Sequence, residues 1–450
     1  MKRFWLVLLS LGLVLAFSAS AMAVDVKFSG SFYAAGMYLD KTNLKKAEGT
    51  TNWGSEGVST AFYYQRLRVQ TDFIVSPGLK LVTRFDAMER AWGAPRKAAD
   101  TALAADSYGT TAENENIAFD WAYIDYASPI GLFQVGLMED GSTGTIFGNS
   151  LTTAGRIKYA YTIGPVSVKA DITKVTDNSS TAKTPVTYTD GDKDKYGIEG
   201  VYAWKDGRAG MKVSYQNYAD NKLLLDYKQQ YFQFTPYAIA KIGPVDIQAE
   251  LNYATGNYKK YGNGTGDVTL SNISGWIDAT AAFGPVYFGG TFAYISGDDQ
   301  ATTDKWEGGT LSGGNDWNPC LIMFNTYDRG FWAGSIAGYG NAADTGGMKN
   351  AWFGQGRVGV KPFAALDIMA SLSYATADKK PWATAGDPTT VYLNSSYGYE
   401  FDVTGTYKIT NNLSYMLGVG YWFVGDYYKA NTTSSLKDEY MLINKLTLTF

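Results

Sequence analysis

Residues 63–86 form two runs in which apolar side chains alternate with polar or charged ones, and a Ser-Pro-Gly turn separates the runs. One face of these runs is apolar, and the other carries Arg66, Arg68, Lys80 and Arg84. Successive side chains of a β-strand point to opposite faces, so the pattern predicts a hairpin with one apolar and one charged face. The architecture of the whole chain depends on which of these faces is the inside.

The first 23 residues read as a secretory signal peptide. Lys2 and Arg3 precede an apolar run from Phe4 to Phe17, and the small-residue sequence Ala21-Met22-Ala23 follows it. The apolar run is short and ends at a good cleavage site, which disfavours the alternative of a retained membrane anchor. We therefore expect residues 1–23 to be removed and the mature protein to span residues 24–450.

The composition excludes several functional classes. The chain has 39 lysines and arginines against 43 aspartates and glutamates, and removal of Lys2 and Arg3 takes the net charge from −4 to −6. This balance disfavours nucleic-acid binding. The chain has no histidine, so histidine-based catalysis and histidine metal ligands are excluded. Its single cysteine, Cys320, cannot form an internal disulfide and is expected to be a structural thiol. We predict no cofactor, no metal and no enzyme activity.

The alternation of residues 63–86 recurs along the chain in segments of about ten residues, which is the length of a tilted strand that crosses a bilayer. After residue 23 no stretch of 18 apolar residues exists that could form a membrane-spanning helix. Eighteen strands are predicted, with 16 as the alternative count. Their ranges are 25–39, 59–75, 79–91, 115–127, 131–138, 155–163, 165–175, 194–205, 207–218, 229–242, 244–256, 271–283, 285–297, 350–361, 363–377, 397–410, 412–427 and 438–450.

Short turns and long loops alternate between these strands. The turn signals are Ser76-Pro77-Gly78, Ser128-Pro129, Gly164-Pro165, Asp206-Gly207, Gly243-Pro244, Gly284-Pro285, Lys361-Pro362 and Asn411-Asn412. The long polar segments are 40–58, 91–114, 176–193, 257–269 and 298–349. This asymmetry is typical of an all-β, antiparallel up-and-down transmembrane barrel with short periplasmic turns and long extracellular loops. One domain, residues 24–450, is expected, with 298–349 as its longest loop.

The chain ends in YMLINKLTLTF, an apolar alternation that closes on Phe450. With the signal peptide and the hairpin series, this end resembles the outer-membrane porins of Gram-negative bacteria, in which a terminal Phe is a signal to the barrel-assembly machinery. The segment 133–139 also resembles the porin strand before the inward-folded constriction loop, which would place Glu139 and Asp140 at that loop. Two departures exist: Leu137 replaces a basic residue, and the loop 139–154 is shorter than 298–349. Either loop could therefore narrow the pore.

The cost of burying charge in lipid decides the orientation of the hairpin. A lysine or arginine that faces lipid at the bilayer midplane costs about 2–4 kcal/mol, so the charged face must line a lumen, and a barrel of 16–18 strands encloses an aqueous one. By strand order, a basic wall should face an acidic wall across this lumen, as in general porins. The basic wall comprises Arg66, Arg68, Lys80, Arg84, Arg156 and Lys158, and the acidic wall comprises Asp246, Glu250, Asp278, Asp367, Glu400 and Asp402. The alternative is that scattered charges only keep the lumen wet.

Three other patterns in the sequence resemble functional motifs. Gly354 to Gly359 matches a dinucleotide-binding fingerprint, but a strand and a turn follow it where that motif needs a helix. Asp190, Asp192 and Asp194 resemble the start of a calcium loop that lacks its later ligands, so a solvated outer loop is favoured over weak calcium binding. Trp276 and Trp422 share the parity of lumen residues, and packing against an inward loop is favoured over stacking on a sugar.

These observations predict a porin that forms a water-filled channel for passive diffusion of small hydrophilic solutes and ions. The alternatives are a substrate-selective channel for sugars, peptides or anions, and an adhesin or surface-structural barrel. The resemblance implies the outer membrane of a Gram-negative bacterium as the location. It also implies a homotrimer, contact with membrane lipid and lipopolysaccharide, and assembly by the barrel-assembly machinery.

Overall fold

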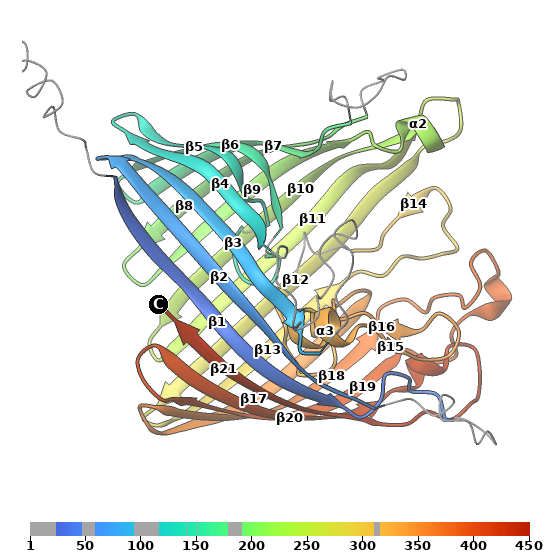
Figure 1. The fold of residues 1–450 in the computed structure, drawn as a ribbon. Helices are drawn as coiled ribbons and strands as arrows, with labels where there is room; N and C mark the ends of the chain where they lie inside the picture. The colour runs from blue at the N-terminus through green and yellow to red at the C-terminus, as the bar shows by residue number, and fades with distance from the viewer. Residues whose placement is uncertain are drawn as a thin grey trace, which may run out of the picture.

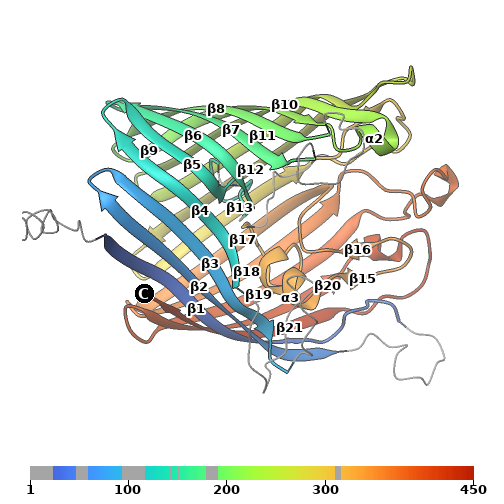
Figure 2. The same cartoon turned by 45° about the horizontal axis from the view of Figure 1, so that its top comes forward.

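The computed structural model describes residues 24–46, 59–93, 117–141, 143–150, 152–178, 191–309 and 316–450. The predicted signal peptide, residues 1–23, lies outside this range. Within it, eighteen long antiparallel strands form one closed ring (Figures 1 and 2). They are β1 (Asp25–Leu39), β2 (Thr60–Ser76), β3 (Leu79–Ala91), β4 (Ile117–Ser128), β5 (Gly131–Glu139), β6 (Thr153–Ile163), β7 (Val166–Thr176), β8 (Lys193–Trp204), β9 (Gly207–Tyr218), β10 (Tyr227–Ile242), β11 (Val245–Tyr261), β12 (Val268–Phe283), β13 (Val286–Ile295), β17 (Ala351–Phe363), β18 (Leu366–Ala377), β19 (Ser396–Lys408), β20 (Leu413–Val424) and β21 (Glu439–Thr449).

Each of these strands pairs with its neighbours in the chain, and β21 pairs with β1 to close the ring, with Ser31 opposite Thr449. A closed ring leaves no unpaired sheet edge, which a sheet in lipid requires. The predicted count of 18 is confirmed, and the strand bounds lie within a few residues of those predicted. The fold class is therefore the predicted up-and-down barrel.

The turns confirm the predicted asymmetry, with one exception. The short turns gather at the end of the barrel where the C-terminus lies (Figure 1), and Gly164, Gly243 and Gly284 adopt positive φ values of 56–61° there. The turn predicted at Lys361-Pro362 is wrong, because β17 continues to Phe363. Pro362 lies at a register shift of the β17–β18 pair, where its missing N–H costs no ladder hydrogen bond.

The remaining elements are short and belong to the long connections. The connection between β13 and β17 contains β14 (Lys305–Trp306), η1 (Thr326–Gly330), α3 (Phe331–Ala333), β15 (Ile336–Ala337) and β16 (Ala343–Asp344). The other short helices are α2 (Lys222–Leu225), η2 (Pro388–Thr390) and η3 (Asp426–Lys429). Among the described residues, no helix is long and apolar enough to cross a membrane.

The hairpin of β2 and β3 answers the question of which face is inside. Arg66, Arg84 and Asp86 are buried in the interior, whereas Leu81 on the opposite face is 39% exposed. The apolar face of the barrel is thus its outer surface, as the lipid argument requires.

Part of the interior is not aqueous. A buried apolar cluster fills the space between the β13–β17 connection and the inner faces of β1 and β17–β21, and it includes Ile322, Met323 and Phe324. The inward-folded loop that the sequence predicted is therefore accompanied by an apolar core on this side of the barrel.

Candidate functional site: a lumen narrowed by two loops

The connection between β5 and β6, residues 140–152, crosses the lumen to the wall formed by β10–β12. Its Thr145 donates two hydrogen bonds to one carboxylate oxygen of Glu250 on β11, from the backbone nitrogen at 2.7 Å and from the hydroxyl at 2.8 Å. Phe147 stacks on Trp276 of β12, with ring centroids 5.8 Å apart. A Cβ atom at Gly148 would lie 2.5 Å from the Glu250 carboxylate, so glycine at this position allows the close approach. Glu250 therefore holds this loop inside the barrel. We call residues 140–152 the first loop.

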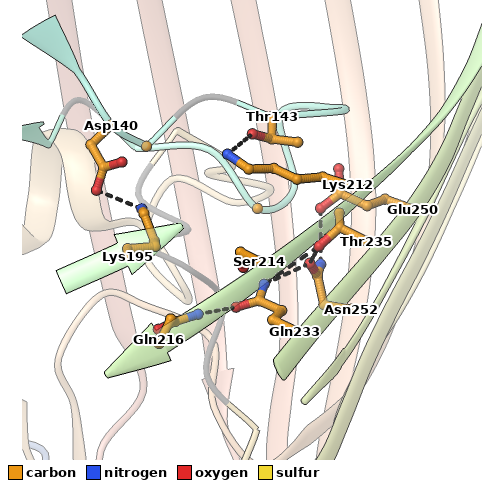
Figure 3. Close-up of a pocket in the computed structure, with 12 residues that line it drawn as sticks. Asp140, Thr143, Lys195, Lys212, Ser214, Gln216, Gln233, Thr235, Glu250 and Asn252 are labelled. Atoms are coloured by element: carbon orange, nitrogen blue, oxygen red, sulfur yellow. Dashed lines mark hydrogen bonds and ion pairs between the residues drawn. The ribbon is translucent and has the colours of Figure 1, made fainter. Parts of the chain in front are cut away.

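Charged side chains hold the base of the first loop. The Asp140 carboxylate accepts a hydrogen bond from Lys195 at 2.6 Å (Figure 3). Arg156 donates to the backbone oxygen of Glu139 and forms an ion pair with Asp171 at 3.1 Å. The predicted placement of Glu139 and Asp140 at an inward loop agrees with this geometry, and their role in constricting a pore stays a prediction.

The connection between β13 and β17, residues 296–350, also enters the lumen and reaches several other strands. Glu400 of β19 accepts hydrogen bonds from the backbone nitrogens of Ile322 and Met323, both at 2.6 Å. Farther along the connection, Asp328 accepts from the Tyr64 hydroxyl at 3.0 Å and from Lys445 at 2.9 Å. We call residues 296–350 the second loop.

The second loop also has its own buried ion pair. The Arg329 side chain is fully buried and binds the Asp344 carboxylate. Its remaining donors reach the backbone oxygens of Ile322, at 3.0 Å, and Gly334, at 2.9 Å. A buried guanidinium needs this complete set of partners, so the pair fixes the conformation of the loop.

The two loops meet inside the barrel. The backbone nitrogen of Asp316 in the second loop donates to the backbone oxygen of Asn149 in the first loop at 3.1 Å. Trp317 packs edge-on against Phe147, with ring centroids 5.2 Å apart. The sequence left open which loop narrows the lumen, and the structure places both loops inside it.

A cavity of about 300 Å³ lies between the second loop and the wall formed by β1–β4. We call it the charged cavity. Arg68 binds Asp86 through two hydrogen bonds of 2.6 Å. Arg66 donates to the Tyr327 hydroxyl and lies 3.6 Å from Glu89. The lining residues are Tyr33, Arg66, Arg68, Asp86, Glu89, Asp120, Thr152, Asp316, Thr326, Tyr327, Phe331 and Trp332.

The structure distributes the predicted basic wall over three places. Arg66 and Arg68 line the charged cavity, and Arg84 lies over the Trp121 ring at 3.4 Å, with its Nε 3.1 Å from Asp120. Arg156 and Lys158 line a separate hollow of about 130 Å³ with Trp121 and Tyr123. Lys80 binds Asp72 at 2.7 Å close to a short turn.

The predicted acidic wall is also divided. Glu250, Glu400 and Asp402 are buried in the interior, and the first two anchor the loops. Asp278 forms two 2.7 Å hydrogen bonds with Arg357. The others lie at the short-turn end, where Asp246 is 3.6 Å from Lys241 and Asp367 accepts from Tyr287 at 2.9 Å.

The two walls therefore do not face each other across open water. The loops lie between them, and most of the predicted charges have a partner of opposite sign on the same or a neighbouring strand. Strand order alone omits loops and short-range pairs, which is the physical reason for the difference. The role of these residues in ion selectivity stays a prediction.

Sequence reasoning missed several partners in the lumen. Asp86 lies directly opposite Arg68 in the β2–β3 register, so a register argument could have paired them. Arg357 lies two residues after Gln355 on β17, so both side chains point to the same, inner face. The position of Arg357 inside the glycine-rich motif hid this alternation. No sequence signal pointed to Tyr327, because its position depends on the path of the second loop.

The other motifs have structural explanations. Gly354 to Gly359 lies within β17, so the discarded dinucleotide motif is a strand. Trp276 stacks on Phe147, and Trp422 packs edge-on against Tyr428. Both contacts agree with the prediction that these tryptophans pack against an inward loop.

The described aspartates of the calcium-like motif lie at the start of β8. Asp190 lies outside the described residues, Asp192 is buried, and Asp194 belongs to β8. Asp192 and Asp194 bind Lys174 at 2.8 and 2.7 Å, so their carboxylates already have a cationic partner.

One group of side chains has the atom types of a metal site. Ligand atoms of Cys320, Glu400 and Asp402 lie within 4.8 Å of one another, and all three residues are buried. Burial raises the pKa of the Cys320 thiol far above its usual value, which opposes the thiolate that a metal would need. Both Glu400 oxygens already accept backbone N–H groups, so this group is explained as an anchor of the second loop.

Comparison with known proteins rests on structure alone. No protein-family model matches the chain, and no curated protein matches it. Similar solved structures come from Pseudomonas aeruginosa. OpdK with vanillate has a TM-score of 0.50 and 11% identity, over 94% of this chain and 99% of that one. OccK2 (OpdF) in complex with glucuronate has a TM-score of 0.50 and 13% identity, over 96% and 99%. OccD3 (OpdP) has a TM-score of 0.51 and 11% identity, over 96% and 94%.

At these identities the likeness establishes the fold. The chain has the 18-stranded closed barrel of Gram-negative outer-membrane channels, and this fold places it in the outer membrane, as the sequence predicted.

Proposed function

We propose that the chain is a substrate-selective outer-membrane channel for small hydrophilic solutes. This was the alternative to a general diffusion porin in the sequence analysis. The observation that carries the proposal is the meeting of the two loops inside the barrel, where Asp316 binds Asn149 and Trp317 packs on Phe147. General porins fold one loop into the lumen, whereas two joined loops leave less space, so each solute should pass in contact with side chains.

The lining of the charged cavity supports selectivity. Guanidinium and carboxylate groups alternate there beside the rings of Tyr33, Tyr327 and Trp332. Charges held in a narrow, partly apolar space act on a solute more strongly than charges in open water. A solute with polar groups and an apolar part would be oriented in this cavity during its passage.

Planar-bilayer recording of the purified protein tests the proposal. We expect a small single-channel conductance that one class of organic solute blocks in a concentration-dependent way. A large ohmic conductance that no solute blocks would contradict selectivity and favour the general porin. An absence of conductance in a folded, inserted protein would exclude the channel itself and favour the adhesin.

The features of biogenesis remain part of this proposal. We infer cleavage after Ala23, a mature chain of residues 24–450, assembly guided by Phe450, contact with lipopolysaccharide and a homotrimer. Phe450 is 50% exposed on the outer surface, and its backbone pairs with Gly30 at the seam of the barrel. Mass spectrometry of the mature N-terminus and of the intact oligomer in detergent tests the cleavage and the subunit number.

A further inference from the structure

A second cavity lies near the long-loop ends of β10, β11 and β12, on the inner face of the barrel wall. It has a volume of about 190 Å³, and Trp306 of β14 closes one side of it. None of the described residues that line this cavity carries a charge. We call it the amide cavity, because carboxamides and aromatic rings make up most of its lining. The charged cavity has the opposite character, so the two sites select for different solute chemistry.

Aromatic rings form one side of the amide cavity. The Trp306 and Tyr258 rings stack with centroids 4.6 Å apart and an interplanar angle of 12°. Trp306 is fixed in place, because it pairs with Leu270 of β12 and its indole N–H donates to the backbone oxygen of Gly308 at 3.1 Å. A rigid aromatic surface offers its face to the C–H groups of a ring-shaped solute at little entropic cost.

Gln233 and Asn252 of the lining are hydrogen-bonded to other side chains, whereas three further polar groups can bind a solute. Among the described residues, neither the Gln229 carboxamide nor the Tyr231 hydroxyl has a hydrogen-bond partner. Asn272 donates through its amide nitrogen to the backbone oxygen of Gly308 at 2.9 Å, which leaves its amide oxygen as an acceptor. Carboxamides and tyrosine hydroxyls can both donate and accept, and so can the hydroxyl groups of a sugar.

We propose that the amide cavity binds an uncharged, polyhydroxylated ring such as a monosaccharide. A charged solute would lose hydration here without meeting an opposite charge. An apolar solute would leave Gln229 and Tyr231 without partners. A sugar satisfies these groups and lays its apolar face on the aromatic side. This inference rests on the proposed function. A sugar bound at the long-loop end of the barrel lies where a solute would enter the channel.

Titration of the full-length protein in detergent tests this site. D-glucose is the probe, D-glucuronate is its charged counterpart, and calorimetry measures binding. We expect saturable binding of glucose that is tighter than that of glucuronate. Trp306→Ala should weaken glucose binding about tenfold and Gln229→Ala severalfold. Trp204→Ala, an exposed tryptophan near a short turn, is the matched control and should leave the glucose affinity unchanged.

Three results would overturn the inference: no saturable glucose binding, glucuronate binding as tight as glucose binding, or equal losses of glucose affinity in the Trp306 and Trp204 variants. The heat-dependent gel shift of a folded barrel verifies each variant, and Gln229→Ala serves if Trp306→Ala does not fold. Calorimetry in detergent requires no conduction. Glucose binding without conductance in bilayers would therefore refute the proposed function and leave the site, whereas conductance without glucose binding would refute the site alone.

Discussion

The two loops inside the barrel are held by different kinds of interaction. The Glu250 carboxylate and the ring of Phe147, which packs on Trp276 and Trp317, hold the tip of the first loop. The second loop packs its own apolar cluster against the opposite side and contains the buried pair Arg329–Asp344. The first loop contributes one side chain, Phe147, to the hydrophobic cluster of the interior, whereas the second loop contributes many. Loss of a single contact should release the first loop and leave the barrel intact, whereas the second should loosen only when its core is damaged.

The largest effect should come from breaking the buried pair of the second loop. Arg329→Ala leaves the Asp344 carboxylate buried without its partner, which typically costs about 3–5 kcal/mol. We expect the second loop to leave its docked position and become sensitive to protease in the intact barrel. Lys429→Ala removes a partly exposed ion pair with Asp426 and should have little effect. Equal rates of proteolytic cleavage in the Arg329→Ala and Lys429→Ala variants would contradict the role of the buried ion pair in holding the second loop.

The second-largest effect should come from replacement of Glu250, which holds the first loop. Glu250→Ala removes the acceptor of two hydrogen bonds from Thr145, and a hydrogen bond to a charged group contributes about 1.5–3 kcal/mol. We expect the first loop to move away from β11 and the single-channel conductance to rise, with no change in thermal stability. Glu250→Gln retains an acceptor and should raise the conductance less. Asp246→Asn, at the short-turn end, is the control.

A smaller effect should follow charge reversal beside the charged cavity. Replacement of Arg66, Arg68 and Arg84 by glutamate makes this side of the lumen more negative, which should shift the reversal potential in a salt gradient toward cation selectivity. Lys80→Glu, close to a short turn, should shift it less. An unchanged reversal potential in the triple variant would refute the role of these arginines in selectivity.

The smallest effect should be a pH dependence set by Asp316 on the second loop. Burial raises the pKa of this carboxyl above its usual value, so it takes up a proton at a higher pH than an ordinary aspartate does. Lowering the pH should therefore remove one negative charge from the charged cavity and reduce cation selectivity. Asp316→Asn should abolish this part of the pH dependence of the reversal potential. If the variant and the unchanged protein show the same dependence of reversal potential on pH, Asp316 is not the group that titrates.

The barrel was predictable and the site was predictable only in part. Alternation reports which residues share a face, and turn chemistry reports where strands end, so the sequence located nearly every strand of the ring. It also assigned Arg66, Arg84, Glu250 and Glu400 to the interior, where they lie. Strand order placed the two charged walls on opposite sides of the ring, but it says nothing about the loops that lie between them, and the role of the walls stays a prediction.

The sequence by itself determined that the chain is a barrel whose charged faces point inward. This follows from local rules: side chains alternate along a strand, and a charge is too costly in lipid. Only the tertiary structure decided how the lumen is divided. The positions of Tyr327, Phe147 and Trp306 depend on contacts between loops and strands that are far apart in sequence, and no periodic pattern encodes such contacts.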